Sequence, residues 1–184
     1  MVDLRRIRQD TITAIESIDL IAVHEYADQI IDKLRRQQTI FTCGNGGSAA
    51  QAMHLAAELV GRYRSKTRPH LKAICLNTDI AAMTAIANDF GYEHVFARQL
   101  AALGKRGDML IAFSTSGASK NVINAIRQAW DEDISSLIIT GRSHASNESP
   151  GWISVNDVDT ARIQEAHQVI IHMLCEIIDE VFTI

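Results

Sequence analysis

The sequence predicts an α/β fold in which a doubly wound parallel sheet of about five strands lies between layers of helices. The first observation is a set of short runs that are apolar throughout, which is typical of strands buried on both faces of a parallel sheet. The second is that these runs alternate with helical patterns along the chain, and β-α-β order places helices on both sides of such a sheet.

The elements follow in order along the chain. Residues 3–36 carry two apolar stripes separated at Asp19, a residue type favoured at helix N-caps, so two helices in series are expected. Residues 160–182 form a helix that is apolar nearly all round, which indicates burial against the sheet or another subunit. Strands are predicted over residues 39–43, 71–77, 109–115, 136–140 and 152–155, with helices between them near 48–61, 79–88, 93–103 and 119–130.

Length and composition favour one globular domain. A chain of 184 residues with 47% hydrophobic residues can bury one sizeable core, and it shows no internal repeat and no linker rich in proline or glycine. We therefore expect a single domain over residues 1–184, with a helical segment at 1–38 in an oligomer interface and an α/β core at 39–184.

Charge and cysteine usage exclude several classes of function. The net charge is −4 and the basic residues are scattered, so direct binding of nucleic acid is not expected. The three cysteines are odd in number and form no CxxC pair, which argues against a disulfide framework and a thiolate zinc site and favours the cytoplasm. The sequence has neither a secretory apolar region near its start nor an apolar run long enough to span a bilayer, so no membrane association is expected.

Two loops at predicted strand ends carry the residue types that bind phosphate. The segment Gly44–Ser48 follows the first strand and opens a helix, and glycines there allow backbone N–H groups to approach an anion. The segment Ser114–Ser119 follows the third strand with four hydroxyl groups and a glycine. Neither loop matches a Walker A or a dinucleotide fingerprint, and small polar residues also occur as ordinary turns and caps.

Two helices carry candidate metal ligands. His54 and Glu58 are four residues apart, so they share one helix face, as two metal ligands or an acid–base pair would. An ordinary solvated contact between the two side chains is the alternative. Gln164, His167 and His172 lie on the apolar C-terminal helix, where each polar group needs a partner because an unsatisfied one costs about 1–3 kcal/mol.

Four motifs together resemble the SIS (sugar isomerase) domain family and, within it, the bacterial phosphoheptose isomerases, which convert sedoheptulose 7-phosphate to D-glycero-D-manno-heptose 7-phosphate for heptose biosynthesis. The motifs are "CGNGGS…AMHLAAELVGRYR" from residue 43, "ANDFG" (87–91), "FSTSGAS" (113–119) and "RIQEAH…H" (162–172). The resemblance implies a homotetramer of Rossmann-like subunits, with active sites between subunits and one zinc ion per subunit.

The resemblance also implies roles for residues at matching positions. The implied zinc ligands are His54, Glu58, Gln164 and His172. The implied substrate-binding residues are Asn45, Gly46, Gly47, Ser48, Glu58, Asn88, Asp89, Ser114, Thr115, Ser116, Ser119 and Gln164, with the serines mostly on the phosphate. Proton transfer through an enediol is assigned to Glu58 and His172, with zinc polarising the substrate oxygens.

The sequence departs from the isomerase pattern at two positions. Ala161 stands where an aspartate is typical, with Asp159 as a possible substitute, and Gln51 stands where an aspartate is usual. The run at 76–89 resembles a different SIS branch, a tetramer that binds the replication initiator DnaA and is not known as an enzyme.

Two alternatives to the phosphoheptose isomerase therefore stay open: a non-catalytic scaffold that binds DnaA, and an isomerase of another ketose phosphate. A sugar-sensing transcription regulator is disfavoured, because roughly 38 residues before the first strand are too few and too acidic for a helix-turn-helix domain.

Overall fold

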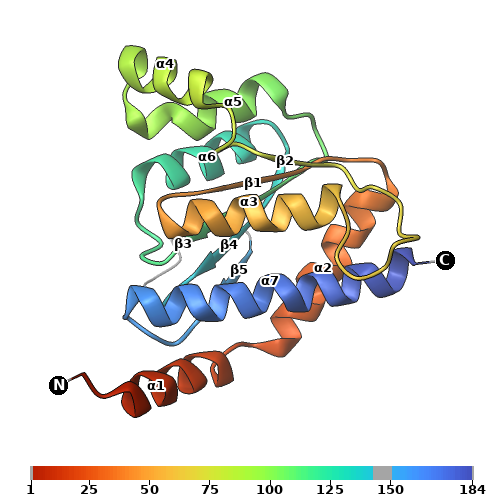
Figure 1. The fold of residues 1–184 in the computed structure, drawn as a ribbon. Coiled ribbons are helices and arrows are strands. Elements are labelled where there is room, and N and C mark those ends of the chain that lie inside the picture. Colours follow the sequence, from red (N-terminus) through yellow and green to blue (C-terminus); the bar gives the residue numbers. More distant parts are fainter. Residues whose placement is uncertain (1, 143–150, 184) are drawn as a thin grey trace.

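The computed structural model describes residues 2–142 and 151–183, which form one five-stranded sheet with helices on both faces (Figure 1). The sheet order is β2-β1-β3-β4-β5, and every neighbouring pair is parallel. The strands are β1 (Ile40–Gly44), β2 (Ala73–Cys75), β3 (Met109–Ser114), β4 (Ser135–Thr140) and β5 (Trp152–Ser154). The predicted α/β parallel fold is confirmed.

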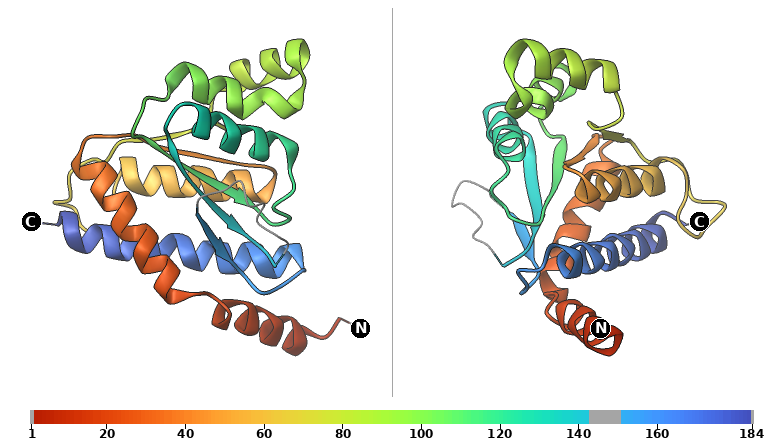
Figure 2. Two further views of the ribbon diagram at one scale, coloured as in Figure 1. Left: turned by 180° about the vertical axis from the view of Figure 1, so that it is seen from behind. Right: turned by 60° about the vertical axis from the view of Figure 1, so that its left-hand side comes forward.

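The helices divide into two layers, one on each face of the sheet (Figure 2). The helices are α1 (Leu4–Glu16), α2 (Leu20–Arg35), α3 (Gly47–Val60), α4 (Ile80–Phe90), α5 (Val95–Leu103), α6 (Lys120–Asp131) and α7 (Thr160–Phe182). The first core cluster lies between the sheet and α1, α2, α3 and α7, and the second lies between the sheet and α5 and α6. Because β1 and β3 are buried along their whole length, each contributes side chains to both cores.

Two elements differ from the sequence-based prediction. The predicted strand at 71–77 contains only three strand residues, since Thr78 already turns back onto the carbonyl group of Cys75. The predicted helix at 93–103 is a 3-10 turn, η1 (Tyr92–His94), followed by α5. Hydrophobic periodicity does not distinguish a 3-10 turn from the start of an α-helix, because both place apolar residues three to four positions apart.

Four helices begin with an aspartate cap. The side chains of Asp3, Asp19, Asp79 and Asp159 each accept a hydrogen bond from a backbone N–H group in the first turn of α1, α2, α4 and α7, respectively. Such a cap satisfies donors that have no partner within the helix. Asp19 therefore separates α1 from α2 as the sequence predicts.

The sheet order brings two distant loops to one edge. β1 and β3 are neighbours, so their carboxyl ends lie side by side although about seventy residues separate them. The helix after β1 packs on one face of the sheet and the helix after β3 on the other. The point between two such strands is where open parallel sheets hold their ligands. No helix in the described part of the chain has the length and apolar character needed to cross a bilayer.

Candidate active site

A cavity of about 320 Å³ lies at the carboxyl ends of β1 and β3. The residues that line it come from both loops, from the end of β3 and from the first turns of α7. They are Asn45, Gly46, Gly47, Ser48, Phe113, Ser114, Thr115, Ser119, Thr160 and Gln164. The structure therefore joins most of the predicted substrate-binding residues around one space, and none of these lining residues is charged.

The backbone around the cavity is arranged to present N–H groups. Gly46 and Gly117 adopt φ angles of 56° and 63°, a left-handed conformation in which residues with a side chain are strained. The helices that open at the cavity, α3 and α6, have no side-chain cap of the kind that Asp3 or Asp159 provides. Their first N–H groups, with the positive ends of two helix dipoles, favour an anion in this space.

Amide side chains fix the loop after β1. Asn45 and Asn121 exchange two hydrogen bonds of 2.8 Å, and the Tyr92 hydroxyl donates to Asn45 Oδ1 at 3.1 Å. Because Asn121 lies on α6, this reciprocal pair ties the first loop directly to the second helix of the cavity. Tyr92 and Asn121 were not predicted as site residues, since nothing in their spacing indicates a contact with residue 45.

Gln164 of α7 closes one side of the cavity. Its side-chain amide lies so near Gly47 that a Cβ atom added there would be 2.6 Å from Gln164 Nε2. The buried Gln51 of α3 donates to the Gln164 carbonyl oxygen. A side chain at position 47 would therefore displace the Gln164 amide from its place at the cavity.

A second cluster of polar side chains, His54, Glu58, Gln168 and His172, lies further along the line where α3 packs against α7, called the seam below. His54 Nε2 is 3.2 Å from Glu58 Oε1, which confirms that the two side chains share a helix face. Gln168 Nε2 is 3.0 Å from His54 Nδ1 and 3.1 Å from His172 Nε2. The His54 and His172 rings are 5.3 Å apart between centroids. The structure thus brings three of the four predicted zinc ligands together and adds Gln168, which the sequence analysis missed.

The donor chemistry of this group suits zinc, which binds imidazole nitrogen and carboxylate oxygen at about 2.0–2.2 Å. The 3.2 Å between His54 Nε2 and Glu58 Oε1 is close to the roughly 3.3 Å that separates two zinc ligands in tetrahedral geometry. No three His, Cys, Asp or Glu side chains of the described residues are spaced to enclose a metal ion. Of the predicted zinc ligands, His54 and Glu58 are therefore the pair already at ligand spacing. Gln164 lies at the cavity and not beside this pair.

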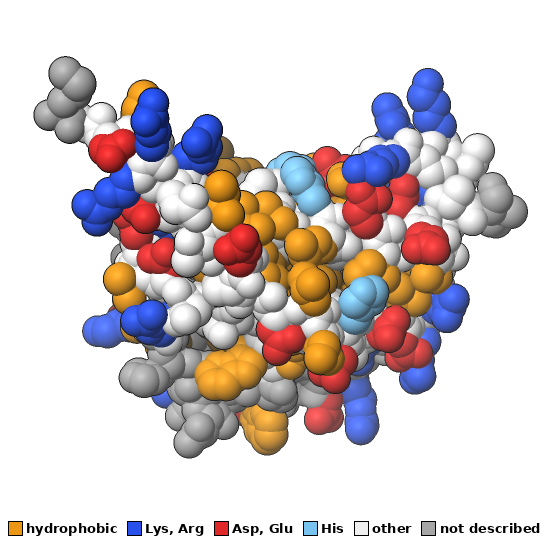
Figure 3. All heavy atoms as spheres, turned by 90° about the horizontal axis from the view of Figure 1, so that it is seen from below, with side chains coloured by type: hydrophobic (Ala, Val, Ile, Leu, Met, Phe, Trp, Pro, Cys, Tyr) orange, Lys and Arg blue, Asp and Glu red, His pale blue; other side chains and the backbone are white. Residues whose placement is uncertain are grey.

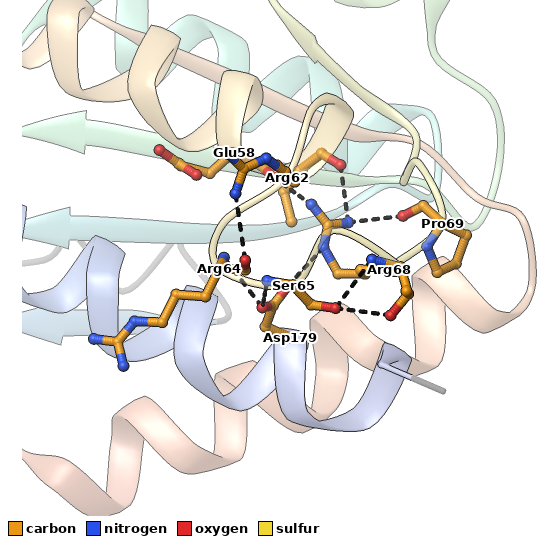
Figure 4. A network of polar contacts seen from close by, with 9 residues as sticks. Glu58, Arg62, Arg64, Ser65, Arg68, Pro69 and Asp179 are labelled. Atoms are coloured by element: carbon orange, nitrogen blue, oxygen red, sulfur yellow. Dashed lines mark hydrogen bonds and ion pairs between the residues drawn. The ribbon is translucent and has the colours of Figure 1, made fainter.

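A buried ion pair anchors the end of α3 that carries Glu58 (Figure 4). Arg68 Nε lies 2.7 Å from Asp179 Oδ1 of α7, and both side chains are almost fully buried. The same guanidinium donates to the backbone carbonyl groups of Glu58 and Leu59. Asp179 also accepts from the N–H of Ser65. Arg68 thus fixes the last turn of α3 against α7.

Four predicted substrate-binding residues lie outside the cavity lining: Glu58, which contacts His54, and Asn88, Asp89 and Ser116. Asn88 and Asp89 are exposed on α4, where Asn88 Nδ2 donates to Asp89 Oδ1 at 2.8 Å. Ser116 lines a smaller neighbouring cavity of about 230 Å³ together with Asp157 and other residues. Asn88 and Asp89 are therefore not among the cavity residues, whereas Ser116 lies beside the main cavity, because its own cavity shares Thr115 and Thr160 with it.

His167 of the RIQEAH motif is a core residue. Its side chain is fully buried, with its ring 6.1 Å from that of Phe113, and within the described chain neither ring nitrogen has a hydrogen-bond partner of good geometry. Burial lowers the pKa of His167 to about 4, partly opposed by the Thr140 carbonyl. The ring is therefore neutral at pH 7.

Comparisons with known proteins point to one family. A family model described as "SIS domain" matches residues 7–141. Phosphoheptose isomerase from Campylobacter concisus is 47% identical over 170 residues, which cover 91% of this chain and 89% of that protein. Phosphoheptose isomerase from Helicobacter pylori is 49% identical over 163 residues, 88% of this chain and 84% of that protein.

Solved structures give the same result. The phosphoheptose isomerase GmhA from Neisseria gonorrhoeae superposes with a TM-score of 0.87 at 38% identity, covering 96% of this chain and 97% of that one. A phosphoheptose isomerase from Francisella tularensis superposes with a TM-score of 0.88 at 32% identity, covering 98% and 100%.

Proposed function

The chain belongs to the SIS domain family and, within it, to the phosphoheptose isomerases, and on this premise we propose how its residues isomerise sedoheptulose 7-phosphate with a bound zinc ion. Membership among isomerases favours catalysis over a non-catalytic DnaA-binding tetramer. The observation that carries the proposal is the row of polar side chains along the seam between α3 and α7. It starts at the cavity beside Gly47 and Gln164 and ends at His54, Glu58 and His172.

The substrate phosphate binds in the cavity at the ends of β1 and β3. Two helices without side-chain caps supply backbone donors, and Ser48, Ser114 and Ser119 supply hydroxyl groups. Ser114 Oγ lies 3.5 Å from Ser119 Oγ, so both hydroxyl groups can turn toward one phosphate. Neutral donors at helix N-termini are a recurring way to bind phosphate.

The distance along α3 matches the length of the substrate. Gly47 at the cavity and His54 are seven residues apart, which is roughly 10 Å along a helix axis. An extended seven-carbon sugar phosphate has about this length between its phosphate and its first carbons. A phosphate held at Gly47 therefore places the reacting end near His54, Glu58 and His172.

The reaction moves a carbonyl group from C2 to C1. One side chain removes a proton from C1 while O2 gains a proton, which gives an enediol; C2 then gains a proton while O1 loses one, which gives the aldose. We assign the two carbon-bound proton transfers to Glu58 and His172, which come from different helices and meet at the seam. Zinc, held by His54, Glu58 and His172, would polarise the substrate oxygens; the Gln164 amide, the fourth ligand of the implied set, would join them on turning from Gly47 toward His54.

The position of Ala161 bears on this assignment. Asp159, the possible substitute for the usual aspartate, accepts a hydrogen bond from the Ala161 N–H at 2.8 Å and so caps α7. Its carboxylate therefore has a structural role, and the isomerisation proposed here uses Glu58 and His172 without it.

Surface composition supports assembly into the proposed homotetramer. Figure 3 shows hydrophobic side chains gathered across the middle of one face of the subunit. None of the residues of α4 is buried, although the helix is largely apolar. Large exposed apolar side chains lie on α2, α3 and α4: Leu20, Ile21, Met53, Val60, Ile80 and Phe90. A neighbouring subunit that covers them would remove this apolar surface from water.

The first experiment is turnover of sedoheptulose 7-phosphate by protein treated with a chelator, with and without added zinc. We expect zinc-dependent formation of the aldose phosphate, and Glu58→Gln should abolish turnover while phosphate binding and folding are retained. Glu132→Gln, exposed just after the end of α6, is the matched control and should keep the wild-type rate. An unchanged rate in Glu58→Gln would refute the assigned role of Glu58.

A further inference from the structure

We propose that Gln168 is a positioning residue of the metal site, whose amide sets the tautomer and ring orientation of His54. The inference rests on the proposed function, because it concerns how the zinc ligand is prepared. It goes beyond the four ligands assigned above, and it starts from the two hydrogen-bond distances at Gln168.

A single pattern of hydrogen atoms satisfies every contact in this group. The Gln168 amide has two N–H donors, and its Nε2 atom is within 3.1 Å of nitrogens on two different imidazoles. A neutral imidazole has one acceptor nitrogen and one donor nitrogen. If Gln168 donates to His54 Nδ1, the His54 proton is on Nε2 and is donated to Glu58 Oε1 at 3.2 Å. In this pattern each imidazole accepts one hydrogen bond from the Gln168 amide.

A bound metal ion would change His54 Nδ1 from a hydrogen-bond acceptor to a donor. A metal ion shared by His54 and Glu58 takes the place of the proton on Nε2, so the ring proton moves to Nδ1 and needs an acceptor. Histidine ligands almost always donate this second N–H to a carbonyl or carboxylate oxygen. A half-turn of the Gln168 amide presents Oε1 to Nδ1 and withdraws the N–H group from His172 Nε2. One amide therefore serves the metal-free and the metal-bound states.

The neighbouring amide does not fill this position. The Gln164 side chain lies against Gly47, one helical turn from Gln168 and towards the phosphate cavity. Gln51, the other amide on the seam, donates to the Gln164 carbonyl. Gln168 is thus the side chain of the seam that contacts His54 Nδ1.

The test is the zinc affinity of the chelator-treated protein, measured by competition with a chromogenic chelator. Gln168→Leu keeps the approximate volume but removes the acceptor, and we expect zinc affinity to fall tenfold to a hundredfold. Gln168→Glu restores an oxygen acceptor and should recover most of the wild-type affinity. Gln128→Leu on α6, away from the seam, controls for loss of a glutamine in general and should leave affinity unchanged.

The outcomes separate the two proposals. Wild-type protein that binds no zinc would overturn the metal site itself and the role of Gln168 with it. Wild-type protein that binds zinc, with equal binding by Gln168→Leu, would overturn the role of Gln168 alone. Equal losses in the leucine and glutamate variants would show that an acceptor oxygen at this position does not support zinc binding, and would also overturn the inference.

Discussion

Replacing His167 by glutamine should make the protein less sensitive to acid. The His167 ring is fully buried beside Phe113, and burial lowers its pKa to about 4. In the unfolded chain a histidine has a pKa of about 6.5. Above that value the ring is neutral in both states. Between the two values the unfolded chain gains a proton that the folded chain does not, so the free energy of unfolding falls as the pH falls.

The size of the effect follows from the two pKa values. At pH 5 the linkage relation gives a loss of about 2 kcal/mol relative to pH 7, and the loss approaches roughly 3 kcal/mol near pH 4. Below the folded-state pKa the loss no longer grows, because both states carry the proton. A loss of about 2 kcal/mol is a large fraction of the stability of a typical domain.

The assay is urea unfolding of the wild type and of His167→Gln at pH 7 and pH 5, at one fixed protein concentration because assembly affects apparent stability. The variant should lose about 2 kcal/mol less than the wild type between the two pH values, whatever its absolute stability. His70→Gln in the exposed loop before β2 is the matched control and should keep the wild-type loss. Equal losses in His167→Gln and the wild type would refute the reasoning.

Two further substitutions test the site's supports. Arg68→Ala removes one partner of the buried pair with Asp179 and should lower the free energy of unfolding by about 3–5 kcal/mol in urea melts. Arg68→Ala combined with Asp179→Asn should recover part of this loss, and no recovery would count against the ion pair as its cause. Ser119→Ala should weaken phosphate binding tenfold to a hundredfold by calorimetry, about 1.5–3 kcal/mol. Ser135→Ala at the start of β4 is its control, and equal affinities would place the phosphate elsewhere.

The sequence predicts the ends of β1, β3, β4 and β5 to within one residue, and β2 is the strand that it predicts poorly. β1 and β3 are buried at every position, so their apolar runs are unbroken. β2 has three residues, one of them exposed, because it lies at the edge of the sheet and pairs only with β1. The buried residues Leu71 and Leu76 on either side of β2 lie outside the strand. A run of apolar residues does not show where such a strand ends.

The sequence also predicts one part of the candidate site better than the other. The glycine and serine loops are recognisable because they follow predicted strands, and their convergence follows once β1 and β3 are neighbours. Gln168 was missed because a glutamine in an apolar helix has no motif of its own. Its role depends on which face of α7 meets α3, and hydrophobic periodicity does not fix the rotation of one helix against another to within a single side chain.

The position of the cavity gives a bound phosphate a mechanical role as well. The sheet keeps the two helical layers apart, with α3 in one and α6 in the other, yet both helices begin at the cavity. A ligand that accepts hydrogen bonds from the N-termini of both α3 and α6 would hold the two helices together at the carboxyl end of the sheet. Binding in this one cavity would therefore connect the layer that carries His54 and Glu58 with the layer that carries Asn121, although the two layers have separate cores.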